Sequence, residues 1–333
     1  SVRISGGEVV ASSKGADAKG AGIGGGTEAS GGAVEVSGGT VAASCEGASS
    51  VGGAGIGSGF GGAGVTVSIS GGRIKASGYG SGIGAGESST AGVSITGGLF
   101  AEGDVGAGTV YGIKPADGFA VRDNLLADKG DYPCAVAVPV GDFAVMGGTE
   151  GVDYSYDLLS STLRFSTGEP MAVSMKDGVS KIQDSRILVS AGTDANITLA
   201  GVNIELSGSY DCAFEIESGA SAKLTLMKDS DNFLVSGASH AGLEVTGGAS
   251  VTIGGEGSLT AKCVGTSAYG AGIGGGASAS VGDVAITGGT VVASCESSGN
   301  AIGAGIGAGY RGSGGIVKIT GGVVIPSSGS GFA

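Results

Sequence analysis

The chain has 333 residues, of which 75 are glycine, 41% are hydrophobic and only 14% are charged, with a formal net charge of −13. This negative charge argues against nucleic-acid binding, which requires clustered Lys and Arg, and the glycines lack the three-residue period of collagen. No apolar run approaches the roughly 18 residues of a membrane-spanning helix, so we expect neither nucleic acid nor membrane insertion.

The motif V-x-[IV]-[ST]-G-G recurs from the first residues to the last part of the chain. Most neighbouring copies are 26 to 33 residues apart. Apolar residues alternate with variable ones in each copy, which predicts a half-buried strand. The Gly-Gly pair predicts a sharp turn, because glycine adopts positive φ readily. The copies begin at Val2, Val34, Val67, Val93, Val284 and Val317.

Each motif is followed by a second alternating strand, a polar loop and a glycine-rich element related to "GAGIG". Three strands and three turns in about 30 residues form one coil of a solenoid. We therefore predict an all-β, right-handed parallel β-helix, the hand following the general preference of parallel crossovers. We expect the central isoleucine of each element in the structural core, with Gly and Ala where neighbouring coils touch. These isoleucines are Ile23, Ile56, Ile83, Ile273 and Ile306.

Three segments follow one another along the chain. Residues 1–118 form a first series of coils, residues 119–150 a linker or capping insertion without a coil pattern, and residues 151–333 a second series. The less regular coils at the start of the second series are typical of capping repeats. Because the chain begins inside a repeat, we expect a monomeric fragment of a larger mature protein.

The run "GAGIGGG" contains the glycine spacing of a nucleotide-binding loop at Gly270, Gly272 and Gly275. Such a loop needs a following helix and, in the P-loop, a lysine. The element recurs five times without either one. We interpret it as a stacking corner and expect no cofactor.

The five cysteines form no C-x-x-C pair and no zinc spacing. Three of them occupy one repeat position shortly before "GAGIG", which favours packing as small apolar residues. We therefore expect no metal site. The cysteines are Cys45, Cys134, Cys212, Cys263 and Cys295, and the three at the repeat position are Cys45, Cys263 and Cys295.

An enzyme that cleaves polysaccharide would need acids gathered from several coils. The exposed middle position of the first strand has no cluster of carboxylates. In successive copies it holds Arg3, Glu35, Ser68, Ser94, Ala285 and Lys318. The acidic candidates lie in loops, where turn formation or solvation explains them: Asp123, Asp128, Asp131, Asp229 and Asp231.

The single histidine and a recurring threonine are two further candidate features. His240 is the only histidine, lies where other coils have "GAGIG", and has no cysteine close to it in sequence, so we expect neither a base nor a metal ligand. Thr198, Thr225 and Thr252 recur every 27 residues and are expected to stack, but single threonines do not favour an ice-binding array. We therefore expect no catalytic residues.

The run from "SRILVSAGTDANITLAGVNIELSG" through "GAGIGGG" to "VAITGGTVVASC" resembles the glycine-rich β-helical repeat regions of large surface proteins from Gram-positive gut bacteria. It is also loosely similar to β-helical carbohydrate-binding modules. The resemblance implies an extracellular location, a multi-domain parent and adhesion, with polysaccharide or host glycan as the ligand. It implies no catalytic residue, and a β-helical polysaccharide lyase or glycoside hydrolase is the alternative. Tyr79, Tyr111, Tyr269 and Tyr310 are the candidates for sugar stacking.

Overall fold

The computed structural model describes residues 1–47, 51–101, 115–206 and 211–330. The chain forms two compact units. Unit 1 consists of Ser1–Val138 with Met146–Thr149, and unit 2 of Pro139–Val145 with Glu150–Ala333. The division falls inside the segment predicted to be a linker or cap. The described residues contain strands and turns but no helix, as the sequence predicts.

Unit 1 contains the first series of coils, and its strands stack in parallel. β1 (Val2–Gly15) pairs with β3 (Ala33–Gly47), with register shifts where the Gly-Gly pair interrupts the alternation. The first half of β3 then pairs with β5 (Val65–Ile69) and its second half with β6 (Arg73–Ser77). Each Gly-Gly pair therefore joins two strands of one coil.

The remaining strands of unit 1 are short corner strands, two strands that continue the parallel stack on β5 and β6, and an antiparallel end. β11 runs antiparallel to both β9 and β10, so the parallel stacking ends there. These strands are β2 (Ile23–Gly24), β4 (Ile56–Gly57), β7 (Ile83–Gly84), β8 (Ala91–Ile95), β9 (Leu99–Phe100), β10 (Ala120–Asp123) and β11 (Cys134–Val140), whose last residues belong to unit 2.

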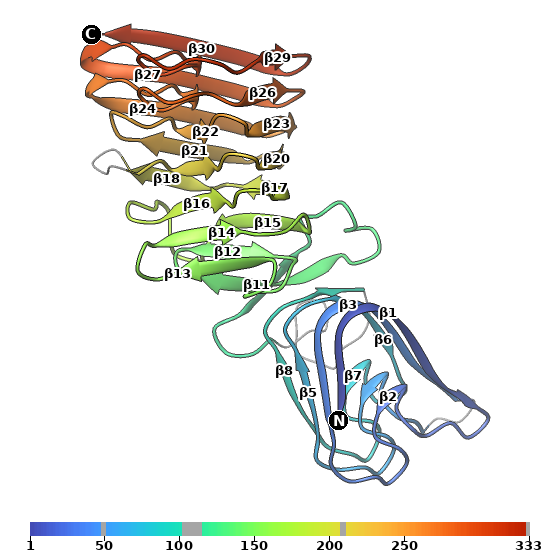
Figure 1. Ribbon diagram of the computed structural model, residues 1–333. Helices are drawn as coiled ribbons and strands as arrows, with labels where there is room; N and C mark the ends of the chain where they lie inside the picture. The colour runs from blue at the N-terminus through green and yellow to red at the C-terminus, as the bar shows by residue number, and fades with distance from the viewer. Residues whose placement is uncertain (48–50, 102–114, 207–210, 331–333) are drawn as a thin grey trace. The chain divides into compact units, whose positions relative to one another are not determined.

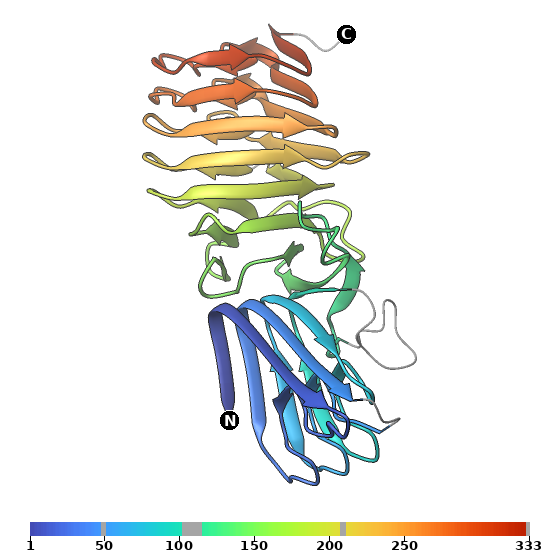
Figure 2. The ribbon, with the colours of Figure 1, turned by 90° about the vertical axis from the view of Figure 1, so that its right-hand side faces the viewer.

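Unit 2 stacks its strands in three parallel sheets (Figures 1 and 2). The first contains β15 (Pro170–Met175), β17 (Asp194–Ala200), β20 (Ser221–Leu226), β23 (Ser250–Gly255), β26 (Asp283–Ile286) and β29 (Val317–Ile319), with β12 (Phe143–Met146) beside β15. The second contains β13 (Tyr154–Asp157), β14 (Thr162–Phe165), β16 (Arg186–Val189), β19 (Phe214–Ile216), β22 (Leu243–Val245), β25 (Ile273–Gly274) and β28 (Ile306–Gly307). The third contains β18 (Asn203–Leu206), β21 (Asp231–Ser236), β24 (Ser258–Ala268), β27 (Thr290–Ala301) and β30 (Val323–Ser330).

From β17 to β28, each coil of unit 2 contributes one strand to each sheet, as β20, β21 and β22 do, and the next coil repeats the order directly beside it. This confirms the predicted all-β parallel β-helix. The exception is the hairpin of β13 and β14, which is antiparallel. It lies at the start of the second series, where the sequence predicted irregular coils.

The predicted threonine row is wrong by one pairing. Thr198 pairs with Thr225, but Thr225 pairs with Gly254. Thr252 lies beside Lys223 instead. The coil between these strands is longer than the 27-residue spacing assumes, so counting a fixed period shifts the register.

The isoleucines of the "GAGIG" elements form two inward-facing rows, one in each unit. Ile23, Ile56 and Ile83 are in register in unit 1, and Ile273 pairs with Ile306 in unit 2. The first four are buried. Ile306 is only half-buried, because no described coil covers it from above.

The backbone N–H groups of the "GAGIG" corner are hydrogen-bonded to the next coil. The Gly272 N–H donates to the Ala304 carbonyl at 3.0 Å, and the Gly275 N–H donates to the Gly307 carbonyl at 2.9 Å. A Cβ on Gly274, whose φ is +132°, would lie 2.0 Å from the Gly307 oxygen. The amides that a phosphate would need are already bonded, which supports the interpretation as a stacking corner.

All five cysteines are free and buried. Cys263 pairs in register with Cys295, and the two pack together with Ala268. The Cys263 thiol donates to the Ala238 carbonyl at 3.3 Å, and Cys295 donates to the Ala268 carbonyl at 3.4 Å. The expected packing role at this repeat position is therefore confirmed for these two residues.

Substitutions at the corner should destabilise the coil stack. Ile273→Asp places a carboxylate in a dry core and should lower the free energy of unfolding by roughly 3–5 kcal/mol. Gly272→Val adds a side chain whose Cβ would lie 2.4 Å from the Ser294 nitrogen, and should cost about 1–3 kcal/mol or more. Thermal and urea unfolding measure both effects.

Thr252→Val, at an exposed position on β23, is the matched control and should unfold like the wild type. Nucleotide should change none of these transitions. Wild-type stability of Ile273→Asp, or stabilisation by nucleotide that Gly272→Val abolishes, would contradict the stacking account.

Burial makes the stability of unit 2 sensitive to alkaline pH through Cys263. Burial of the thiol is the main cause that raises its pKa to about 12, whereas an unfolded thiol ionises at about 8.5. Because the folded form keeps the proton that the unfolded form loses, this contribution to stability is complete below about pH 8.5 and declines as pH rises toward 12. The variant Cys263→Ser removes this pH-dependent contribution. Serine is already present at the same position of the preceding coil, as Ser236. In urea unfolding, the stability of the wild type relative to Cys263→Ser should fall between pH 8 and pH 11; a constant difference would be inconsistent with the burial effect.

Candidate functional site

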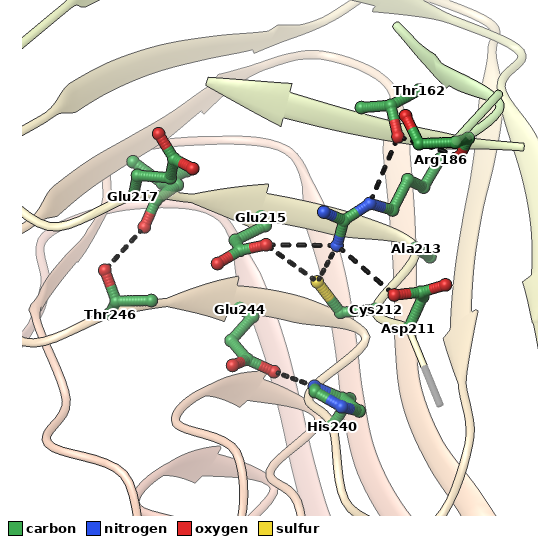
Figure 3. Close-up of polar contacts among 12 residues, drawn as sticks. Thr162, Arg186, Asp211, Cys212, Ala213, Glu215, Glu217, His240, Glu244 and Thr246 are labelled. Atoms are coloured by element: carbon green, nitrogen blue, oxygen red, sulfur yellow. Dashed lines mark hydrogen bonds and ion pairs between the residues drawn. The ribbon is translucent and has the colours of Figure 1, made fainter. Parts of the chain in front are cut away.

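Two coils of unit 2 replace the glycines of the corner by polar residues. Phe214 pairs with Leu243, and Leu243 pairs with Ile273, so both occupy the place of the "GAGIG" isoleucine. One position further along, Glu215 pairs with Glu244, where the next coil has Gly274. The corner therefore carries two stacked carboxylates, and Figure 3 shows the polar residues around them.

Arg186 of β16 lies against the first of these carboxylates. Its terminal nitrogen contacts Glu215 Oε2 at 3.1 Å and Asp211 Oδ1 at 3.9 Å, and its Nε donates to Thr162 Oγ1 at 3.4 Å (Figure 3). Burial raises the pKa of Glu215, while the neighbouring Arg186 opposes that rise. The guanidinium thus favours the charged form of this half-buried carboxylate.

Cys212 belongs to the same coil as Glu215 and lies close to its carboxylate. Its Sγ is 3.9 Å from Glu215 Oε2 and 3.9 Å from the terminal nitrogen of Arg186. The residue is 1% exposed, and burial raises its thiol pKa well above the ordinary value, with a further contribution from the carboxylates of Glu244 and Glu215. These surroundings favour the neutral thiol.

His240 and Glu244 form a close pair four residues apart. His240 Nδ1 lies 2.9 Å from Glu244 Oε2, which also accepts the Ala241 N–H at 3.1 Å. The hydrogen bond to Glu244 is the main cause that raises the pKa of His240. The Glu244 side chain is 10% exposed and that of His240 is 33% exposed, so the imidazole forms the solvent side of the pair.

The cluster brings together a thiol, an imidazole and carboxylates. One ligand atom from each of Cys212, His240 and Glu244 lies within 4.8 Å of the other two. A nucleophilic cysteine needs a lowered pKa and access to substrate, and Cys212 has neither. The three ligand atoms do, however, lie close enough together to hold one metal ion.

The expectation that no cysteine lies near His240 is wrong, because Cys212 lies close to it in the structure. Cys212 comes from the preceding coil, and the parallel stacking brings it to the histidine. The sequence does contain a pattern that aligns the two coils. The segments "DCAFEI" and "HAGLEV" have a glutamate at the same position. The "GAGIG" pattern used to find coils is missing from both.

The loop acids singled out in the sequence are divided between the two units. Asp128 contacts Arg73 at 2.6 Å in unit 1, so it stabilises a local structure there. Asp229 has a positive φ of 59° in a turn of unit 2, next to Asp231 at the start of β21. In the row predicted along the first strands, all members are exposed except Glu35 and Ala285, which are half-buried, and Arg3 and Glu35 form an ion pair at 2.8 Å.

Aromatic side chains lie next to the "GAGIG" corners. Tyr269 and Tyr310, from neighbouring coils, have ring centroids 5.4 Å apart and planes at 46°. The guanidinium carbon of Arg311 lies 4.9 Å from the centroid of the Tyr310 ring. Tyr79 in unit 1 is 50% exposed. Tyr111 lies outside the described residues.

A family model described as a beta helix repeat matches residues 2–27, 34–60, 67–87 and 284–310. These matches fall on coils of both units and support a β-helical repeat protein. Neither the curated proteins nor the solved structures include a significant match to the chain. Among the described residues there is no helix with the length and apolar character to cross a membrane.

Removal of Arg186 should destabilise unit 2. In Arg186→Met, the half-buried Glu215 loses its cation, and the free energy of unfolding should fall by about 1–3 kcal/mol. Lys228→Met is the control, because its ion pair with Glu256 is solvent-exposed and should contribute less than about 0.5 kcal/mol. Urea unfolding of both variants at pH 7 measures the difference. Equal effects would mean that Arg186 is only another surface charge.

Proposed function

We propose that this chain is a non-enzymatic, extracellular β-helical module of a surface adhesin that binds neutral polysaccharide. The observation that carries this proposal is the tyrosine pair of unit 2, formed by two successive coils at the edge of the stack.

The tyrosine pair presents aromatic surface at a fixed spacing. Tyr269 precedes its own corner and Tyr310 follows the corner of the next coil, and the Tyr310 N–H donates to the Tyr269 carbonyl at 2.6 Å. This bond between coils fixes the backbones that carry the two rings side by side, and both residues are partly exposed. Aromatic rings pack against the apolar faces of sugars, while phenol hydroxyls and the exposed Arg311 supply hydrogen bonds.

The charge of the chain selects among glycans. A net charge of −13 repels polyanions at moderate ionic strength. Neutral polysaccharides are not repelled by the charge of the chain. They are therefore the ligand class that we favour over pectin or mucin.

The acids of the corner cluster support a non-enzymatic role. Hydrolysis requires an acid and a base that both reach the substrate. Glu244 Oε2 is bonded to His240 and to the Ala241 N–H, and Glu215 is held by Arg186. Both carboxylates are engaged inside the protein.

The alternative is a polysaccharide lyase or glycoside hydrolase, and one observation favours it. Asp211, Glu215 and Glu244 converge from neighbouring coils, together with an arginine and a histidine. Convergent acids are the arrangement that the enzyme hypothesis requires. Product formation distinguishes the two functions.

The test is affinity electrophoresis of the full chain in gels that contain neutral plant glycans, pectin or mucin. Retardation should be strongest in a neutral glycan, and Tyr310→Ala should weaken it by about tenfold, the order expected for one aromatic contact. Phe233→Ala, which removes an exposed aromatic ring from β21, should leave it unchanged. Chromatography of the incubated glycans checks for products.

Absence of retardation, or equal losses in the two variants, would contradict the proposed tyrosine site. Released oligosaccharides that disappear in Glu215→Gln and Glu244→Gln would establish the enzyme instead.

A further inference from the structure

The structure assigns a binding site for a thiophilic divalent cation of the zinc class to the corner cluster, with Cys212 Sγ, a ring nitrogen of His240 and a carboxylate oxygen of Glu244 as its ligands. Their ligand atoms all lie within 4.8 Å of one another. This inference is independent of glycan binding and goes beyond it.

The distances fit a shared cation after small side-chain movements. Zinc binds sulfur at about 2.3 Å and imidazole nitrogen or carboxylate oxygen at about 2.0–2.2 Å, so tetrahedral ligands are separated by about 3.3–3.7 Å. His240 Nδ1 and Glu244 Oε2 are 2.9 Å apart, slightly closer than this, and the sulfur is at most 4.8 Å from either. The cation would take the place of the proton that His240 and Glu244 share.

The donor set selects the class of cation. A thiolate, an imidazole and a carboxylate suit zinc and similar borderline-soft ions, whereas calcium and magnesium prefer oxygen ligands alone. On coordination the Cys212 thiol releases its proton to solvent. The thiolate and the Glu244 carboxylate then balance the two positive charges of the ion.

Neighbouring groups orient the ligands and balance the charge beside them. The charge of Arg186 is offset by Glu215 at 3.1 Å, so the guanidinium does not impose a net positive charge on the site. The Ala241 N–H donates to Glu244 Oε2 and fixes the carboxylate, as outer hydrogen bonds do in metal sites. The one-third exposure of the His240 side chain gives the ion a path from solvent.

The fold itself does not require these side chains. Counting back from the pairs of Phe214 with Leu243 and of Leu243 with Ile273, Cys212 takes the place of an alanine and His240 that of a glycine in the "GAGIG" coil. The coil around Ile273 stacks with only Gly and Ala there. A thiol, an imidazole and a buried carboxylate in the same small volume thus have a role other than stacking.

The experiment titrates the chelator-treated full chain with Zn²⁺ by calorimetry and with Co²⁺ by absorption spectroscopy. We expect one ion per chain and, with cobalt, a thiolate-to-metal charge-transfer band in the near ultraviolet. Cys212→Ala and Glu244→Gln should each weaken binding by at least about 10–100-fold. Cys212→Ala reproduces the alanine of other coils, and Cys263→Ser, which removes an equally buried thiol, should bind like the wild type.

X-ray absorption of the zinc-loaded wild type gives a second measurement that does not depend on the variants. One sulfur and two or three nitrogen or oxygen neighbours at zinc-ligand distances support the site. A shell without sulfur, a cobalt charge-transfer band that persists in Cys212→Ala, or no binding above that of this variant would overturn it. The cluster would then be a hydrogen-bonded packing arrangement only.

Discussion

The separation of neighbouring coils is the constraint on which the rest of the structure depends. Parallel strands that share backbone hydrogen bonds lie about 4.8 Å apart, and in each unit this spacing applies to the corners as well as to the sheets. At Gly274, a Cβ would lie 2.0 Å from the carbonyl oxygen of Gly307. The high glycine content thus follows from hydrogen bonding between corners, although glycine loses more conformational entropy on folding than any other residue. Each coil recovers this cost by burying its inward row against its neighbours, which is a property of the stack and not of a single coil.

The same constraint determines where chemistry can arise. Side chains on the inward rows are enclosed, and the outward positions of the sheets are mostly exposed, but a corner whose glycines are replaced becomes a small, partly buried space. Cys212 and His240 are far apart in sequence, yet one coil step places their ligand atoms together. A solenoid can therefore assemble a compact polar cluster from residues that no short motif connects.

The sequence predicts the coil and its core well, because both depend on short patterns. The corner isoleucines repeat with their glycines, and the register of Ile23, Ile56 and Ile83 follows directly. The cluster was not predicted, because its coils lack the "GAGIG" pattern and their register depends on loop lengths. A two-residue error of this kind placed Thr252 beside Thr225 instead of Lys223. In a stack where one step brings residues into contact, register errors of this size exchange one set of neighbours for another.

Charge pairing between coils shows why the corner cluster is unusual. Parallel stacking in register places like residues side by side, which is favourable for isoleucine and unfavourable for glutamate. Along the strands the chain avoids this conflict: Arg3 lies beside Glu35 and Lys14 beside Glu46, each forming an ion pair. At the corner, Glu215 and Glu244 are register partners of the same sign in a poorly solvated place. Their repulsion is offset only because Arg186 approaches one and His240 the other. Arg186 and His240 both lie outside the glutamate row, so several residues maintain the cluster together. Loss of Arg186 leaves Glu215 beside a second glutamate from which the stack cannot move it away.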